Sequence, residues 1–410
     1  MLGRRRCLLP LLVGAGLLGR AAADARTTTD TANKGEADAL REMRDGLTDK
    51  SGLFRTNWTD GTDVCTWKGV ACSYSGVTLL NLRNKDLTGE LPDDFFARLP
   101  NLHAIYLQGN RITGKLALGS MLRACTKLKA LYLHEGNHFK GSFGVKEGER
   151  IYAGELRVLN IANNQLEGPL PSFASFDKLE ELDLRGNSFK GKLHPSVFEL
   201  KHLRTLHVDH NALSGTLPAS APKKRHRFPK EFKALGVAGN SFTGPLPGWL
   251  FELAQDTLLD VDVSSNEFTG TIPESFGLLT SVKAIDASHN QLTGCFPPHL
   301  DWLTSLEFFS FEHNKLHCGI PGELGQLRKL KSIKVAHNNL YGEIPLELAD
   351  APQLTEMVVE GNYDLCGLEP EEQDPRALRL RKIVQSTDQT AVGKACRRLP
   401  TYVPSDPEEL

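Results

Sequence analysis

The sequence has no excess of charge of either sign. Its 48 Lys and Arg residues are balanced by 50 Asp and Glu residues, which leaves a formal net charge of -2 over 410 residues. We therefore do not expect a nucleic acid as the main ligand, because no domain-wide basic surface is available to displace the counterions of a phosphate backbone. Hydrophobic residues make up 40% of the chain, which also excludes wholesale disorder.

Long apolar runs are missing beyond the first 25 residues. A membrane-spanning helix needs about 18 or more such residues, so we expect no membrane span. At the N-terminus, Arg4–Arg6 precede the apolar stretch Cys7–Leu18, and Ala21–Ala23 follow. These three parts are typical of an export signal and predict a signal peptide over residues 1–23, followed by a flexible mature N-terminus over residues 24–34. Export also predicts passage through an oxidising compartment.

The rest of the sequence is a repeat array. The segments Leu306–Lys329 and Leu330–Gln353 both fit the pattern LxxLxLxxNxLxGxIPxxLxxL. Lys85 holds the place of the recurring Asn in a first repeat, which gives twelve repeats between Val77 and Leu368. The recurring residues are Asn110, Asn137, Asn164, Asn187, Asn211, Asn240, Asn266, Asn290, Asn314, Asn338 and Asn362. No single repeat can bury its apolar face alone, so the repeats must stack into a solenoid.

One repeat indicates the secondary structure. In the LxL motif the two apolar residues share one face of a strand, so Ile333 and Val335 point inward and Lys334 points outward. The Asn amide, which has two donors and an acceptor, can satisfy the backbone of the turn and reach the next coil. The GxIP segment predicts a second short strand, and the remainder predicts a short helical return. The expected fold is an α/β solenoid with a parallel sheet about 50 Å along its curved edge.

The two ends of the array need caps, because the outer coils would otherwise expose core side chains. We expect an N-terminal cap over residues 35–76, with a helix from Gly35 to Leu47, whose apolar residues have helical spacing. The solenoid covers residues 77–368, and a C-terminal cap and tail cover residues 369–410.

Three motifs identify a resemblance. These are Cys65–Cys72 (CTWKGVAC), the repeated NxLxGxIP run, and Asn362–Gly367 (NYDLCG). Together they make about residues 35–368 similar to plant-type extracellular leucine-rich-repeat proteins, which include receptor-like kinase ectodomains, receptor-like proteins and polygalacturonase-inhibiting proteins. The resemblance implies a right-handed, horseshoe-shaped solenoid with a concave recognition face. The sequence contains no HRD or DFG kinase motif.

The caps of this family imply two disulfides, Cys65–Cys72 and Cys366–Cys396. A third follows from the repeat spacing, because Cys295 and Cys318 are 23 residues apart where the local repeat is 24. Stacking of about 4.8 Å combined with a slip of about 3.3 Å places their Cα atoms about 5.8 Å apart, within disulfide range. Cys125 remains, and we expect a small buried core residue there.

The outward positions of the inner strands are the candidates for ligand binding, since the concavity of a solenoid is its usual binding surface. Tyr106 and Tyr132 should stack in one column, and the middle of the face should carry mixed charge followed by an acidic stripe. The alternative is that such residues only keep the sheet soluble. The candidates are Arg83, Tyr106, Gln108, Tyr132, His134, Asp183, Arg185, His207, Asp209, His210, Asp260, Asp262 and Asp286.

His289, His313 and His337 occupy the same slot in three successive repeats. Stacked strands would place them about 5 Å apart. Protonation would then make the imidazoles repel and could weaken this face in acid. Two alternatives are a divalent-ion site aided by Glu312 and Glu360, and an ordinary variant of the repeat.

Three other motifs bear on catalysis, glycan binding and glycosylation. His134–His138 matches H-E-x-x-H, but a zinc protease needs that motif on a helix, whereas a strand and a turn are expected here. We therefore predict no enzyme activity, no metal site and no cofactor. Pro222–Glu231 carries five Lys or Arg residues in an exposed loop, which either contacts anionic glycans or has no role. Asn57 begins the sequon Asn-Trp-Thr and is the predicted glycosylation site.

The leading hypothesis is a secreted, cell-surface or wall-associated protein that binds a protein, a peptide or a glycan on its concave face. The resemblance adds a separate membrane receptor kinase as a partner. Two alternatives are an inhibitor of secreted wall-degrading glycosidases, whose basic rim would meet the acidic stripe, and a structural wall protein without a specific ligand.

Overall fold

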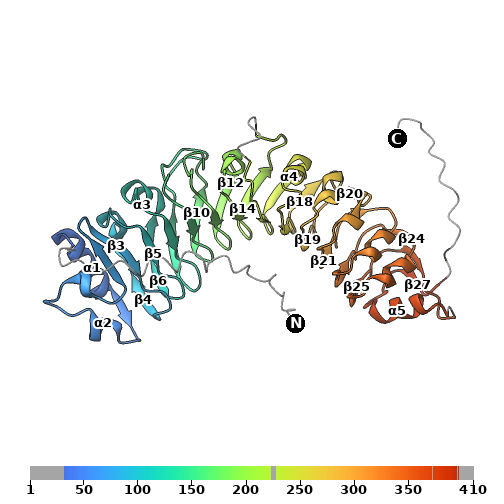
Figure 1. Cartoon of the computed structure of the whole chain (residues 1–410), viewed down its shortest axis with the longest axis horizontal. Coiled ribbons are helices and arrows are strands. Elements are labelled where there is room, and N and C mark those ends of the chain that lie inside the picture. Colours follow the sequence, from blue (N-terminus) through green and yellow to red (C-terminus); the bar gives the residue numbers. More distant parts are fainter. Residues whose placement is uncertain (1–31, 223–227, 372, 395, 397–410) are drawn as a thin grey trace.

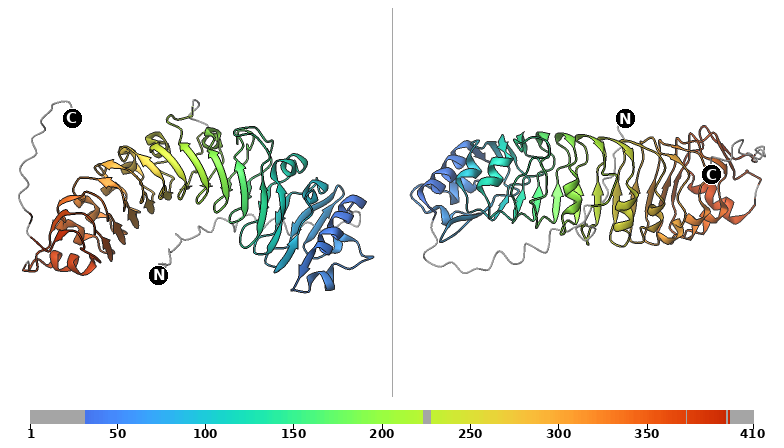
Figure 2. Two further views of the ribbon diagram at one scale, coloured as in Figure 1. Left: turned by 180° about the vertical axis from the view of Figure 1, so that it is seen from behind. Right: turned by 90° about the horizontal axis from the view of Figure 1, so that it is seen from above.

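The computed structural model describes residues 32–222, 228–371, 373–394 and 396. The predicted signal peptide, most of the basic part of the Pro222–Glu231 loop and the last residues of the tail lie outside them. The described chain forms one curved arc of stacked coils (Figure 1). Two further views show the arc from behind and the coils side by side from above (Figure 2).

A thirteen-stranded sheet runs the length of the arc. Twelve of its strands, β3 to β25, are parallel, one from each predicted repeat, and β2 forms an antiparallel hairpin with β3 at the N-terminal end. This confirms the solenoid with twelve repeats. The strands are β2 (Val70–Ser73), β3 (Gly76–Asn81), β5 (Ala104–Tyr106), β7 (Ala130–Tyr132), β9 (Val158–Asn160), β11 (Glu181–Asp183), β13 (Thr205–His207), β15 (Ala234–Gly236), β17 (Asp260–Asp262), β19 (Ala284–Asp286), β21 (Phe308–Ser310), β23 (Ser332–Lys334) and β25 (Glu356–Val358).

A second sheet is built from the segments after the recurring asparagines, here called the ladder asparagines, as the GxIP pattern predicts, and β1 of the N-terminal cap joins it by pairing antiparallel with β4. Its strands are β1 (Leu47–Asp49), β4 (Leu87–Glu90), β6 (Arg111–Ala117), β8 (His138–Ser142), β10 (Gln165–Pro169), β12 (Ser188–Lys192), β14 (Ala212–Thr216), β16 (Ser241–Pro245) and β18 (Glu267–Thr269). Shorter sheets continue it with β20 (Thr293–Gly294) and β22 (Lys315–Leu316), and then with β24 (Tyr341–Glu343), β26 (Asp364–Gly367) and β27 (Ala391–Val392).

Short helices complete the coils, and α3 and α4 mark the outer side of the arc (Figure 1). They are η2 (Phe95–Arg98), α3 (Leu118–Ala124), η3 (Pro195–Glu199), α4 (Gly248–Leu253), η5 (Glu274–Leu278), η6 (Leu300–Trp302), η7 (Gly322–Gln326) and η8 (Leu346–Asp350). One continuous apolar core lies between the helices and the sheets. No helix in the described ranges is both long enough and apolar enough to cross a membrane.

The ladder asparagines tie each coil to the one before it. Nδ2 of Asn290 donates to the carbonyl oxygens of Ala287 and Ser288 at 3.2 Å in its own repeat and of Val263 at 3.0 Å in the preceding repeat. Its Oδ1 accepts from the N–H of Phe268, also in the preceding repeat, at 3.0 Å. The other ladder asparagines, from Asn110 to Asn362, make the same backward contacts. The amide therefore satisfies buried turn backbone that would otherwise have no partner.

The second residue after each LxL motif, which in most repeats directly precedes the ladder position, ends the strand with a left-handed backbone at φ between +52° and +72°. These residues, here called the turn column, lie just beyond the strands. They are Asn84, Gly109, Glu135, Asn163, Gly186, His210, Gly239, Ser265, His289, His313, His337 and Gly361. Most are Gly, Asn or His, residue types that adopt this region more readily than others do.

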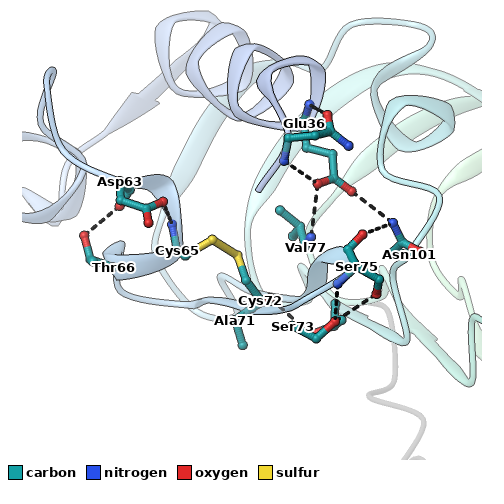
Figure 3. Close-up of a disulfide and its surroundings, with 12 residues drawn as sticks. Glu36, Asp63, Cys65, Thr66, Ala71, Cys72, Ser73, Ser75, Val77 and Asn101 are labelled. Atoms are coloured by element: carbon teal, nitrogen blue, oxygen red, sulfur yellow. Dashed lines mark hydrogen bonds between the residues drawn. A yellow bond between two sulfur atoms is a disulfide. The ribbon is translucent and has the colours of Figure 1, made fainter. Parts of the chain in front are cut away.

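The N-terminal cap is held by a buried carboxylate (Figure 3). Helix α1 (Lys34–Gly46) confirms the predicted helix and opens with a capping box between Asn33 and Glu36. Glu36 is only 1% exposed. Its carboxylate also accepts from the N–H of Val77 at 3.3 Å and from Nδ2 of Asn101 at 3.4 Å, which joins the helix to the first repeats.

The rest of this cap contains α2 (Leu53–Asn57) and η1 (Val64–Thr66). Trp58 and Trp67 stack with ring centroids 4.6 Å apart beneath them. Asn57 is exposed at the end of α2, where a glycan would have room. The structure contains the Cys65–Cys72 disulfide, with the Cα atoms 5.5 Å apart (Figure 3).

At the other end, α5 (Pro375–Ile383) packs on the last coil and buries Ala377 and Leu380. The Arg379 guanidinium donates to the carbonyl oxygens of Ala349 and Ala351 in and after η8. The structure joins Cys366 to Cys396 and Cys295 to Cys318, the second pair with a Cα separation of 5.1 Å. Cys125 is a buried free thiol, and burial raises its pKa to about 12.

Candidate functional site

The concave face is formed by three outward positions of each strand and its extension. Taking β11 as the example, Glu181, Asp183 and Arg185 face outward, while Leu182 and Leu184 are buried in the core. The register holds across the sheet, so equivalent residues form columns. Twelve of the thirteen predicted binding residues lie in these columns. His210 does not: it belongs to the turn column, because the strand has already ended there.

The N-terminal third of the face is aromatic. Tyr106 on β5 and Tyr132 on β7 are register partners, and their rings stack with centroids 5.2 Å apart and an interplanar angle of 13°. The His134 ring meets that of Tyr132 edge-on at 5.8 Å. Burial raises the pKa of both tyrosine phenols, so their hydroxyl groups stay protonated.

Two polar atoms in the same region have no partner. Oε1 of Gln108 and Nδ1 of His134 are buried and form no hydrogen bond with the described part of the chain. The two residues follow Tyr106 and Tyr132 at the same place in neighbouring strands. Burial lowers the pKa of His134, so its imidazole is neutral near pH 7. Buried polar groups without a partner are rare in folded proteins, so a ligand is one explanation.

The middle of the face contains two ion pairs. Arg185 forms a two-pronged pair with Asp183, with Nη2 to Oδ2 at 2.7 Å and Nε to Oδ1 at 3.0 Å. His207 lies with Nδ1 3.3 Å from Oδ2 of Asp209. Burial opposes protonation of His207, but the hydrogen bond and the charge of Asp209 outweigh it, so the pKa of His207 is raised.

Carboxyl groups outnumber these cations. We call Glu181, Asp183, Asp209, Asp260, Asp262 and Asp286 the acidic patch. Asp262 and Asp286 are directly opposite each other on β17 and β19. Burial, followed by the charge of Asp286, raises the pKa of Asp262 to about 7. The pKa of Asp260 and that of Glu181 are also raised, mainly by burial. Oδ1 of Asp260 has no hydrogen-bond partner in the described chain.

Strand β15, which lies between the two halves of the acidic patch, has only very small side chains on its outward face. Its outward residues are Ala234, Gly236 and Ala238, all buried. A Cβ atom on Gly236 would lie 2.4 Å from Oδ2 of Asp209 and 2.5 Å from Nδ1 of His207. Because Gly236 has no side chain, the His207–Asp209 pair can extend across β15 toward Asp260 and Asp262.

The sequence-based list of candidates omitted two concave residues, Glu181 and Asn160. Asn160 donates from Nδ2 to Oε1 of Glu181 at 3.1 Å, which connects the aromatic third to the acidic patch. Glu181 could have been found from its place just before the first Leu of LxL, which also faces outward, as Asp260 does on its strand. Asn160 is the middle residue of its LxL motif and could have been found from that place.

The predicted histidine column exists, but it lies at the rim of the face in the turn column. The rings of His289, His313 and His337 stack with successive centroid distances of 4.2 Å. Nε2 of His337 also lies 3.5 Å from Oε1 of Glu360. Burial, and then the neighbouring imidazoles, lower the pKa of His313. Parallel stacked rings do not converge on one point, so the geometry does not support the divalent-ion alternative.

The H-E-x-x-H string does not form a metal site. His134 faces the concavity, Glu135 and Gly136 have left-handed backbones, and His138 begins β8 in the other sheet. A different group, Cys295, His317 and Cys318, brings its ligand atoms within 4.8 Å of one another. The two sulfur atoms of that group are bonded to each other, so they are not available as thiolate ligands.

Comparison with known proteins gives consistent matches. A profile described as "Leucine rich repeat N-terminal domain" matches residues 33–73, and one described as "Leucine Rich Repeat" matches residues 155–176, 178–200 and 257–279. Receptor-like protein 18 of Arabidopsis thaliana is 28% identical over 232 residues, which cover 56% of this chain and 26% of that protein. Systemin receptor SR160 of Solanum peruvianum is 32% identical over 299 residues, covering 56% and 24% respectively.

The chain thus spans about a quarter of the length of these curated relatives. Among solved structures, the Arabidopsis receptor kinase HAESA, in complex with the peptide hormone IDA and the co-receptor SERK1, superposes with a TM-score of 0.63 at 27% identity. The match covers 88% of this chain and 62% of that one. The stacked repeats, the disulfide-closed caps and these matches make the chain similar to plant extracellular leucine-rich-repeat proteins, namely receptor-like proteins and the ectodomains of receptor kinases.

Proposed function

We propose that this chain is an extracellular recognition protein, not an enzyme, whose concave face binds a peptide or protein segment that carries positive charge. The segment lies across the acidic patch. The observation that supports this most is geometric: the carboxyl groups gather on neighbouring strands, where Asp262 lies directly opposite Asp286. Burial, and then the neighbouring carboxylates, raise the pKa of Asp260 and Asp262, which agrees with a shortage of positive charge beside them.

The patch has six carboxyl groups, and Arg185 and His207 are the only basic side chains paired with them in the described chain. A Lys or Arg side chain of a ligand would supply the missing charge. Hydrogen bonds that involve a charged group contribute about 1.5–3 kcal/mol each. Such a ligand would lower the pKa of Asp262 toward its ordinary value, so binding would release the proton that Asp262 holds below pH 7.

A similar solved structure supports a proposal about the partner of this chain. HAESA was solved with both a peptide hormone and a co-receptor. By analogy, a membrane receptor kinase is the signalling partner that we propose for this chain once it has bound its ligand outside the cell.

The test is calorimetric titration with synthetic peptides of matched length that are basic, neutral or acidic. We expect the basic peptides alone to bind, and the affinity to fall steeply between 50 and 500 mM salt, roughly as expected for screened charges. The triple variant Asp260→Asn, Asp262→Asn, Asp286→Asn should lose binding. A matched control, Glu323→Gln, Glu347→Gln, Asp350→Asn, removes the same charge from exposed residues of η7 and η8 and should bind normally. Equal binding by both variants would place the ligand elsewhere.

An inhibitor of a secreted glycosidase would use the same patch, because a basic enzyme rim is also a cationic protein surface. A panel of polygalacturonases and other wall-degrading enzymes separates the two. Inhibition that the triple variant abolishes would favour the inhibitor, and no inhibition of any enzyme would leave the peptide or protein ligand.

A further inference from the structure

We propose that the N-terminal third of the concave face binds an uncharged sugar ring. This inference rests on the function proposed above for that face. The binding group, here called the aromatic subsite, consists of Tyr106, Tyr132, Gln108 and His134. It lies on β5 and β7 and their extensions, two strands away from the nearest residues of the acidic patch on β11. The two regions are therefore separate binding elements of one face.

The stacked tyrosines supply an apolar platform. Their rings lie nearly parallel, 5.2 Å apart, and both residues are only partly covered by neighbouring side chains. Because each ring turns one face to the other, the surface left for a ligand consists of the ring edges and the outer faces. The C–H groups of a pyranose ring can pack against this apolar surface, and Tyr loses little conformational entropy when it is held, because it has only two rotatable side-chain bonds. Both phenol hydroxyls remain protonated and can donate to ring oxygens.

The unpartnered atoms beside the platform require polar ligand groups. Oε1 of Gln108 accepts a hydrogen bond, and Nδ1 of His134 donates or accepts according to the tautomer. Both residues are partly exposed, and the last side-chain torsion of an amide or imidazole is soft. In this proposal, rotation about that bond turns each atom toward the exposed part of its side chain, where the hydroxyl groups of the sugar bind it.

The absence of charge in the subsite selects among ligands. Tyr and Gln are uncharged, and burial keeps His134 neutral by lowering its pKa. The nearest charges flank the subsite and have opposite signs, because Arg83 acts on Tyr106 and Glu181 acts on Tyr132. A ligand carboxylate, sulfate or ammonium group placed over the four uncharged side chains would be desolvated without a direct partner, which is costly. An aromatic peptide side chain would cover the platform but would leave both polar atoms unpartnered. A neutral sugar ring provides both an apolar face and a rim of hydroxyl groups.

The test uses the full secreted chain and saturation-transfer NMR with neutral oligosaccharides built from glucose, galactose, mannose, xylose or arabinose. Oligogalacturonides serve as anionic probes. We expect at least one neutral oligosaccharide to bind and the oligogalacturonides not to bind. Tyr132→Ala should weaken binding at least tenfold, whereas Tyr132→Phe, which keeps the ring, should stay within about threefold. Gln108→Leu, similar in size but without the acceptor, should also lose about tenfold.

Three results would overturn the proposal. The first is binding of anionic sugars alone, and the second is binding of no sugar. The third is neutral-sugar binding that Tyr132→Ala and Gln108→Leu both leave intact. If Tyr132→Ala fails to fold, Gln108→Leu decides. The triple Asp variant described above should keep sugar binding while losing basic peptides, so a failure of the peptide proposal and a failure of the sugar proposal appear in different variants.

Discussion

At the scale of single residues, the ladder asparagine has the clearest structural role. Each one bonds with backbone groups of two coils, and most are almost fully buried. Its amide combines two donors and an acceptor at a length that fits the turn, so neither Asp nor Gln reproduces it. The motif predicts the position of this residue, and the structure adds the direction in which it reaches.

Asn290→Ala should be among the most damaging single changes in the solenoid. It leaves the buried N–H of Phe268 without its partner and removes one of the two amide donors to the carbonyl oxygen of Val263, where Asn266 remains. We expect a loss of about 2–4 kcal/mol in the free energy of unfolding. Urea titration followed by circular dichroism measures it. Gln291→Ala, on the exposed neighbour, is the control and should change the midpoint little. Equal effects of the two would contradict the assigned role.

Asp262 should make stability depend on pH. Its pKa is about 7 in the folded protein against an ordinary 3.8, so the folded state holds the proton over a range where the unfolded chain has lost it. Its stabilising contribution is therefore full below about pH 4 and is lost as the pH rises to 7. Asp262→Asn should raise the unfolding free energy at pH 8, by on the order of 2–4 kcal/mol, and change little at pH 4. An equal effect at both pH values would refute this.

The histidine column should act in the opposite direction. The pKa of His313 is lowered by burial and by its stacked neighbours, so the folded state resists protonation. Stability from this residue is present above about pH 6.5 and is lost as the pH falls. His313→Asn keeps a residue that tolerates the left-handed backbone and removes the titration. Its melting temperature should fall less than that of the parent between pH 7 and pH 5. The variant also removes one stacked imidazole from His289 and from His337, which relieves the charge repulsion in acid and acts in the same direction. An equal fall in the two proteins would contradict the assigned role of His313.

At the scale of elements, sequence periodicity predicts most of the strands, because the same pattern recurs in every repeat. The inner strands, the second strands, the N-terminal helix and the stacking of Tyr106 on Tyr132 all follow from spacing. The burial of Glu36 did not follow, because it depends on how helix α1 docks against Val77 and Asn101, far away in the chain. The raised pKa values in the acidic patch could not be predicted either, since they depend on burial and on carboxyl groups from different strands that lie close together in the folded chain.

Docking of the N-terminal cap should depend on Glu36. Glu36→Ala removes the capping box of α1 together with the contacts to Val77 and Asn101. We expect a loss of about 2–3 kcal/mol, measured as a lower unfolding midpoint and faster amide hydrogen exchange in α1. Glu42→Ala is the control, because its exposed ion pair with Arg98 should contribute under about 1 kcal/mol. Unchanged exchange in Glu36→Ala would show that packing alone holds the helix.

At the scale of the whole molecule, the protein is a curved array in which each coil contacts mainly its neighbours. Such an array has no central core that isolates its ends from solvent, so its stability depends on both caps. The sequence indicated the caps through cysteines and a helical pattern. It did not show that α5 would cover the last coil, because the contact of Arg379 with backbone carbonyls has no sequence signature.

Removal of residues 369–410 should therefore expose the end of the solenoid. Leu354 and Met357 on the last coil are 2% and 0% exposed, and they lose their cover together with α5. We expect a lower melting temperature, binding of a hydrophobic dye and association of the chains. Deletion of residues 399–410 alone keeps α5 and Cys396 and serves as the control. A monomeric, equally stable 369–410 deletion would show that the last coil caps itself.

The backward reach of the ladder asparagines gives the chain a polarity. Each Asn completes the turn of the repeat made before it, and the first repeat, which has no repeat before it, carries Lys85 in that place. During synthesis on the ribosome, every newly emerged repeat would supply the groups that its already folded predecessor still lacks. Growth from the N-terminus thus leaves only the youngest coil incomplete at any moment, and the group it lacks is the next one to be synthesised.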